Sequence, residues 1–94
     1  MNAEVPIALF RLGRMVATPN ALANLTQEDI LKAIQRHQAG DWGDLSEDDR
    51  RENEFSLKEA LRIFSVYHSA DGVKFYIITE ADRSATTVLL PEDY

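Results

Sequence analysis

The sequence ALRIFSVYHSADGVKFYIITE occupies residues 60–80 and contains two β-rich segments separated by a polar turn. β-Branched and aromatic residues dominate residues 60–68 and 73–80, as is typical of strands. Between them, SADG supplies turn residues, and Gly72 can adopt the positive φ that a tight hairpin requires. We therefore predict an antiparallel hairpin. A third strand, ATTVLL at residues 85–90, follows a second turn and ends at Pro91.

Upstream of the hairpin, the clearest helix signal covers residues 26–38. Thr26 is a suitable N-cap, and Asp29 stands three residues later as the acidic half of a capping box. Gly40 occupies the position where a left-handed residue ends a helix. The predicted buried stripe consists of four apolar residues, Ile30, Leu31, Ala33 and Ile34.

A strand is also predicted near the N-terminus, over IALFRLGRMVA at residues 7–17, before a turn at Thr18-Pro19-Asn20. The element order becomes β-α-(α)-β-β-β, where the bracketed helix lies in the acidic segment described below. We predict a single α+β domain, residues 1–94, with a mostly antiparallel, curled sheet and helix on one face. The hairpin is apolar on both faces, so its second face must curl on itself, pack under the acidic segment or meet another chain.

Composition narrows the class of protein. The chain has 94 residues, 45% hydrophobic and 28% charged, which is typical of one folded domain. It contains no cysteine, which excludes disulfides, thiolate metal sites and cysteine nucleophiles. The N-terminus shows no leader pattern and no long apolar run, so we expect a cytoplasmic protein without a membrane segment.

The net charge of −6 is concentrated in one segment. Residues 41–54, DWGDLSEDDRRENE, carry seven carboxylates and two arginines. Such a surface repels phosphate backbones, so direct nucleic-acid binding is disfavoured. The segment is either an extended loop or a short helix near residues 47–57, capped by Ser46, which would turn Phe55 and Leu57 inward.

We interpret this acidic segment as a candidate surface for a basic protein partner. The candidate partner-binding residues are Trp42, Asp44, Glu47, Asp48 and Asp49, with the indole as an aromatic anchor. The alternative is structural: Trp42 folds back over a small core while the acids hydrate a helix start.

The two histidines do not indicate a metal or catalytic site. His37 and Asp41 could supply two ligands, but there is no second histidine within a turn, and we expect His37 to be solvated at a helix C-terminus. The acidic segment lacks the spacing and the central glycine of an EF-hand loop. Phosphate-binding glycine motifs and a nucleophile elbow are also missing from the sequence. We predict no metal, no cofactor and no catalytic residues.

One basic constellation offers an alternative. Arg62, Tyr67 and Arg83 lie on or beside the hairpin and could contact a phosphate or another target together. The structural alternative is that the arginines pair with Glu80 or Asp82 and that Tyr67 is half-buried.

Two resemblances follow from these motifs. PNAL near the start, GDWG before the acidic stretch, and the closing IITEADRSATTVLLPEDY resemble small, largely uncharacterised bacterial proteins of plasmids and integrative elements, often labelled as type I restriction accessory proteins. This resemblance implies a mobile genetic element as context. The element order, with R-I-x-x-x-Y before a D-G turn and a later arginine, is similar to RelE/ParE toxins. That similarity implies target or nucleic-acid contacts for Arg62, Tyr67 and Arg83, although such RNase toxins are basic and this chain is acidic.

The sequence therefore favours a small, acidic, non-enzymatic binding protein from a mobile element. Its expected form is an inhibitor of a nucleic-acid-processing defence system, anti-restriction or anti-CRISPR, that mimics phosphates toward a basic partner. The alternatives are a RelE/ParE-like toxin acting on RNA or a nucleic-acid enzyme, and a structural or regulatory homodimer.

Overall fold

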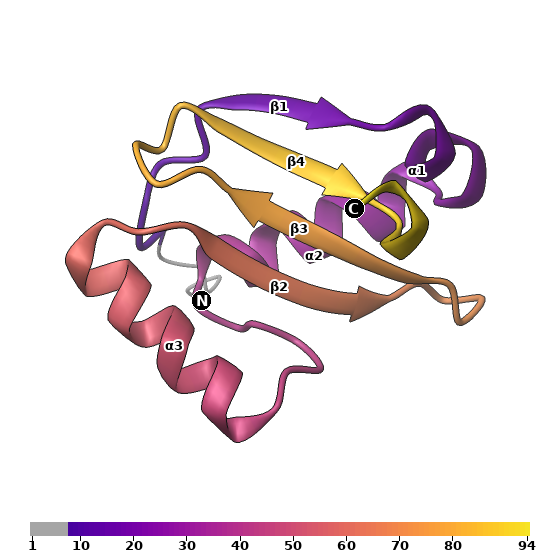
Figure 1. The fold of residues 1–94 in the computed structure, drawn as a ribbon. Helices are drawn as coiled ribbons and strands as arrows, with labels where there is room; N and C mark the ends of the chain where they lie inside the picture. The colour runs from indigo at the N-terminus through magenta and orange to yellow at the C-terminus, as the bar shows by residue number, and fades with distance from the viewer. Residues whose placement is uncertain (1–7) are drawn as a thin grey trace, which may run out of the picture.

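The computed structural model describes residues 8–94 of the protein. It contains a four-stranded sheet flanked by three helices (Figure 1). In chain order the elements are β1 (Arg14–Ala17), α1 (Pro19–Asn24), α2 (Gln27–Gln38), α3 (Glu47–Glu59), β2 (Ile63–His68), β3 (Lys74–Thr79), β4 (Ala85–Leu89) and the 3₁₀ helix η1 (Pro91–Asp93).

The strand order in the sheet is β1-β4-β3-β2. β2, β3 and β4 pair antiparallel, and Gly72 has a φ of 84° in the turn between β2 and β3. β1 pairs in parallel with β4, so the sheet is mixed. The predicted α+β class and the predicted hairpin are confirmed. The parallel pair joins segments about seventy residues apart, and no local signal in the sequence indicates it.

The first strand is shorter than predicted. β1 begins only at Arg14, and residues 8–13 are not in a strand, while Ile7 lies outside the described residues. Gly13 explains the late start because it has a φ of 65° and a Cβ there would lie 2.4 Å from Ser84 backbone atoms. The predicted turn at Thr18 is instead the start of α1, whose first position is Pro19 and whose N-cap Thr18 accepts a bond from Ala21 N–H.

Helix α2 covers one face of the sheet (Figure 1). Its predicted start is confirmed, with Thr26 and Asp29 forming the capping box, and Gly40 follows its end with a φ of 86°. The core beneath it contains Ala21, Leu25, Ala33, Tyr67, Phe75, Ile77, Val88 and Leu90. The prediction that Leu31 is buried is wrong, because the inward side of α2 is centred on Ala33 and His37 and leaves Leu31 54% exposed.

The opposite face of the sheet is covered by the chain's own aromatic side chains. Val66, Ile78 and Leu89 are each no more than 6% exposed there. Phe64 and Tyr76 pack with ring centroids 4.8 Å apart, and the Tyr94 ring lies about 6 Å from both. η1 brings the C-terminus across this face (Figure 1). The predictions for this second face were that it curls on itself, packs under the acidic segment or meets another chain; in the described residues the C-terminal η1 and Tyr94 lie against it.

Candidate functional site

The acidic segment folds as a helix. α3 begins after Ser46, whose hydroxyl accepts a bond from Asp49 N–H, and its first turn contains Glu47, Asp48 and Asp49. Carboxylates in the first turn interact favourably with the positive end of the helix dipole. Of the two predicted alternatives, a short capped helix and an extended loop, the helix is observed, and residues 41–46 form the connection before it.

Helix α3 is attached to β2 mainly through polar side chains. Phe64 N–H donates to Asn53 Oδ1 at 3.1 Å, and Asn53 Nδ2 donates to Phe64 O at 2.5 Å. Asn53 and Ser56 are the buried residues of the helix. The predicted inward placement of Phe55 is wrong, since its side chain is 58% exposed, while Leu57 is half-buried. The Asn53 bonds determine which side of α3 faces the sheet, and Phe55 is not on that side.

The connection before α3 pairs with the same strand edge. Val66 N–H donates to Trp42 O at 3.2 Å, and Asp44 N–H donates to Val66 O at 2.8 Å, forming a parallel bridge at Gly43. A Cβ on Gly43 would lie 1.9 Å from Val66 O, and the residue has a φ of 77°, so this close approach requires glycine. Together with Asn53, the bridge holds α3 at a fixed position beside β2.

Trp42 is part of the core. Its side chain is 1% exposed and packs against the rings of Phe10, at 6.2 Å, and His37, at 5.9 Å. A partner cannot contact the indole in this conformation, which corrects the prediction of Trp42 as a surface anchor. The burial fixes the 42–44 connection and, through it, the start of α3.

Few carboxylates of α3 pair with the protein's own cations. Arg50, the half-buried arginine of the helix, donates to the carbonyls of Gly43 at 2.6 Å and Leu45 at 3.3 Å. Arg51 lies 3.8 Å from Asp48, with both side chains largely in solvent, so this pair contributes little. Within residues 8–94, five exposed carboxylates of the helix have no basic group within 4.0 Å: Glu47, Asp49, Glu52, Glu54 and Glu59.

The two acids of the connection are paired instead. Asp41 accepts two bonds from the Arg36 guanidinium, at 2.7 and 3.2 Å, and this pairing lowers the pKa of Asp41. Asp44 Oδ2 lies 2.7 Å from His68 Nδ1 and remains exposed. The external negative charge therefore belongs mostly to α3 itself.

A groove of about 280 Å³ runs between α3 and the aromatic face of the sheet. Asp49 and Glu52 line its helix side, and Phe64 and Tyr94 line its sheet side, with the Arg62 guanidinium 5.4 Å from the Tyr94 ring. Carboxylates opposite aromatic rings suit a lysine or arginine side chain, which would use ion pairs and cation–π contacts. Glu52, Phe64 and Tyr94 were not among the predicted site residues. Glu52 could have been added because it belongs to the acidic run, but the sequence does not show that the ring of Tyr94 returns to α3.

His37 lies at the centre of a buried polar network. Its side chain is fully buried, with Nδ1 2.6 Å from Ser65 Oγ and Nε2 2.8 Å from Thr79 Oγ1. Thr86 donates to Leu12 O, so Thr79 must donate to Thr86, and the Nε2–H of His37 must donate to Thr79. The prediction of a solvated His37 is therefore wrong. Burial lowers the pKa of His37 to about 3, so the ring is neutral. Its hydrogen-bond partner Ser65 is also fully buried, and a ligand cannot reach either side chain, so we assign the pair to packing.

The structure does not bring Arg62, Tyr67 and Arg83 together. Tyr67 is 1% exposed and donates to Asp41 O, whereas Arg62 packs on Tyr94. Arg83 donates to the carbonyls of Ser56, Leu61, Glu80 and Ala81, which joins the end of α3 to the β3–β4 turn. Arg62 and Tyr67 are five residues apart along an extended segment, about 16 Å. The prediction of a shared contact site for these three residues is wrong.

Among residues 8–94, no group of three or more histidine, aspartate or glutamate side chains is placed to hold a metal ion. In that same range no helix combines the length and the apolar character needed to cross a membrane. Comparison of the chain with protein-family models, curated proteins and solved structures found no match.

Proposed function

We propose that this protein is a non-enzymatic binding protein whose acidic face contacts a basic protein surface. The acidic face consists of Asp44, Glu47, Asp48, Asp49, Glu52 and Glu54. One observation carries the proposal: α3 is oriented through Asn53 and Arg50, so that its carboxylates face solvent, and four carboxylates of the acidic face lack a basic partner in the described chain.

The negative charge of this face is concentrated on a short length of helix. Residues 47–54 carry five carboxylates and two arginines over about 12 Å of helix, since each residue rises about 1.5 Å. The net charge of −3 gives one negative charge per about 4 Å, compared with one per about 1.7 Å of duplex DNA. A protein surface that binds phosphates through arginine and lysine would therefore find a group of anions on α3.

The groove beside α3 adds recognition to the charge. A cation held between Asp49 and Glu52 would lie against the rings of Phe64 and Tyr94, which replace the buried Trp42 as the aromatic part of the contact. A phosphate group offers no such aromatic rings. A protein that offers both carboxylates and aromatic rings to a cation can compete with nucleic acid for the same basic site.

The proposed form of this activity is inhibition of a nucleic-acid-processing defence complex in the cytoplasm, as anti-restriction or anti-CRISPR proteins do. The resemblance of the PNAL, GDWG and C-terminal motifs to proteins of plasmids and integrative elements supports this form. DNA mimicry toward such a complex requires an outward anionic surface held at a fixed position, and the exposed carboxylates of α3 and the Asn53–Phe64 bonds support both requirements.

Affinity capture from nuclease-treated bacterial lysate tests the proposal. The test variant neutralises Glu47→Gln, Asp48→Asn, Asp49→Asn and Glu52→Gln, and leaves Asp44 in place because it contacts His68. The control variant removes the same charge at four exposed acids outside α3: Glu28→Gln, Asp71→Asn, Glu80→Gln and Glu92→Gln.

The wild type and the control variant should retain a basic nucleic-acid-binding complex, and captured complex should lose its DNA cleavage or DNA binding. The test variant should bind it about 100-fold more weakly, because several close charge pairs are lost. Equal retention by the test variant and the wild type would remove the acidic face from the contact, and the proposed function with it.

A further inference from the structure

The free edge of β1 differs from the rest of the surface in its backbone groups. Arg14 N–H donates to Ser84 O at 2.9 Å, and Thr18 N–H donates to Val88 O at 3.0 Å, both on the β4 side. Backbone groups of successive strand residues point to alternate sides of the strand. The amides and carbonyls of Met15 and Ala17 therefore point away from β4. No strand within residues 8–94 pairs with this edge.

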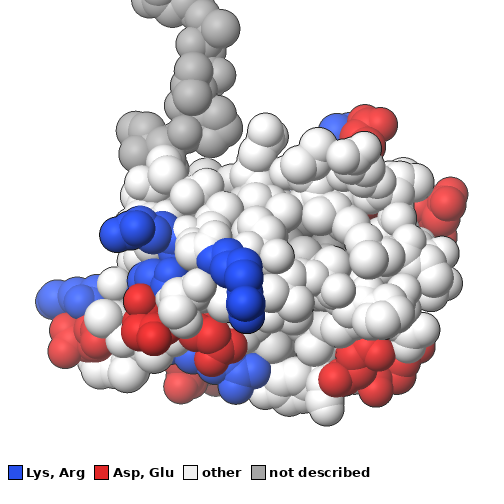
Figure 2. Space-filling view, turned by 90° about the horizontal axis from the view of Figure 1, so that it is seen from above, with Lys and Arg blue, Asp and Glu red and all other residues white. Residues whose placement is uncertain are grey.

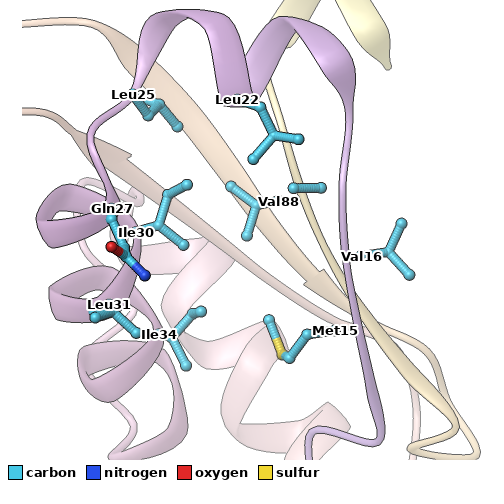
Figure 3. Close-up of a pocket in the computed structure, with 10 residues that line it drawn as sticks. Met15, Val16, Leu22, Leu25, Gln27, Ile30, Leu31, Ile34 and Val88 are labelled. Carbon is cyan, nitrogen blue, oxygen red and sulfur yellow. The ribbon is translucent and has the colours of Figure 1, made fainter.

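An apolar groove of about 530 Å³ lies directly beside the edge (Figure 3). Met15 and Val88 border it from the sheet, and Leu22, Ile30 and Leu31 border it from the helices. Met15, Leu22 and Leu31 are 43%, 63% and 54% exposed. Exposed apolar side chains next to unpaired strand groups are typical of a surface that pairs with another strand.

Charge is distributed unevenly along the same edge. Figure 2 looks onto β1 and shows a broad uncharged centre, with basic and acidic side chains mixed at one end and mostly acidic side chains at the other. Arg14 is the first residue of β1. At the other end Asp93 accepts a bond from Thr18 Oγ1 at 2.7 Å, and this bond lowers the pKa of Asp93, which keeps it charged.

We propose that the β1 edge binds a second copy of this chain, strand to strand and antiparallel, across a two-fold axis at Val16. In this register Met15 lies opposite Ala17 of the second copy, so that their outward amides and carbonyls satisfy one another. Arg14 lies opposite Thr18 of the second copy and reaches its Asp93. The sheets of the two copies become continuous, and the apolar grooves meet beside the axis.

The chain supplies its own charged complement for self-pairing, because Arg14 lies at one end of β1 and Asp93 at the other. An antiparallel two-fold brings Arg14 of each copy toward Asp93 of the other. The inference is independent of the proposed function, because α3 adjoins β2 at the opposite side of the sheet (Figure 1). A dimer would then present two acidic faces to partners.

The chain contains no cysteine, so a single introduced thiol reports the register. The Val16→Cys variant would place two thiols across the axis at a Cα separation of about 4.5 Å, within the range that a disulfide spans. Thr87 is the matched control, because it is the direct neighbour of Val16 on β4. In the proposed dimer its two copies are three strand spacings apart, about 14 Å.

Sedimentation velocity at about 100 µM, where a dimer of micromolar Kd is almost fully assembled, provides the first readout. We expect the wild type to sediment as a dimer and the Val16→Cys variant to form a disulfide-linked dimer at least about ten times faster than the Thr87→Cys variant. A wild-type monomer at this concentration overturns the proposal. A dimer whose Val16→Cys variant cross-links no faster than its Thr87→Cys variant also overturns it, because the copies then meet elsewhere.

Discussion

The β2 edge of the sheet is covered by the chain itself, whereas the β1 edge leaves outward backbone groups beside an apolar groove. At β2, the Asn53 side chain bonds Phe64 and the 42–44 connection bonds Val66. At β1, the described residues offer Met15 and Ala17 no such partners. Unpaired strand edges readily pair with other strands.

The difference shows how the two edges can serve separate contacts. The covered edge cannot accept a strand, and its cover is the same set of bonds that orients α3 and its carboxylates. In the proposed function that side of the molecule interacts through side-chain charge. The open edge has little charge at its centre, and the proposed dimer uses its backbone groups and apolar surface (Figure 2). The two proposals thus assign a partner surface and a self-association surface to opposite edges of one small sheet.

Among the residues that cover the β2 edge, substitution of Gly43 should lower the free energy of unfolding most. Gly43→Ala forces a Cβ into Val66 O and a non-glycine residue into a φ of 77°, so unfolding free energy should fall by about 3–5 kcal/mol. Gly72→Ala is the control, since its φ is also positive but its Cβ would have no neighbour within 4 Å, and it should lose only about 1–2 kcal/mol. Urea unfolding measures both. Equal losses would mean that the close approach at Gly43 does not matter.

Removing the Asn53 side chain should open the same edge less severely. Asn53→Ala leaves Phe64 N–H and C=O without their partner and should reduce unfolding free energy by about 2–3 kcal/mol. The exposed neighbour Glu54→Ala should change it by less than about 0.5 kcal/mol. Concentration-dependent aggregation of the Asn53→Ala variant, followed by light scattering, would report the exposed strand. A variant as stable as the Glu54→Ala control would contradict the role of this clamp.

The buried histidine between the two edges predicts a pH dependence. The pKa of His37 falls from 6.5 to about 3 on folding, so the folded protein holds the neutral ring and loses stability as pH drops below 6.5. Between pH 6.5 and 5, unfolding free energy should fall by about 1.6 kcal/mol, and the slope should approach about 1.4 kcal/mol per pH unit toward pH 5. The His37→Gln variant keeps a donor and an acceptor and should lose most of this slope. An identical slope in both proteins would assign the effect to other groups.

Neutralising the acidic face should affect stability least. The variant with Glu47→Gln, Asp48→Asn, Asp49→Asn and Glu52→Gln loses favourable interactions with the helix dipole but also relieves repulsion between neighbouring acids. We expect a change in unfolding free energy of less than about 1 kcal/mol at moderate salt. Thermal unfolding followed by circular dichroism measures it. A loss comparable to that of Asn53→Ala would show that the carboxylates serve the fold.

Local signals in the sequence predicted much of this fold. Caps at Thr26 and Ser46 and the positive φ at Gly40 and Gly72 depend on residues within one turn, and each is observed. The α+β class followed from these elements. The pairing of β1 with β4 could not be predicted, because it joins distant segments through backbone groups that every residue carries.

Side-chain placement at the site was harder to predict, because it depends on distant partners. Phe55 was expected inside because it is apolar, but Asn53 pairs with Phe64 and thereby turns a polar side of α3 inward. His37 was expected outside because it is polar, but Ser65 and Thr79 on the sheet satisfy both ring nitrogens. The exposure of the carboxylates was predictable, since charged groups without partners remain in water.

Residue-resolved hydrogen exchange tests the asymmetry of the two edges most directly. In dilute, monomeric protein the amides of Phe64 and Val66 should exchange at least about 1,000-fold more slowly than those of Met15 and Ala17. Raising the protein concentration should slow exchange at Met15 and Ala17 alone. Rapid exchange at Phe64 and Val66, or exchange at Met15 and Ala17 that is slow at every concentration, would contradict the account.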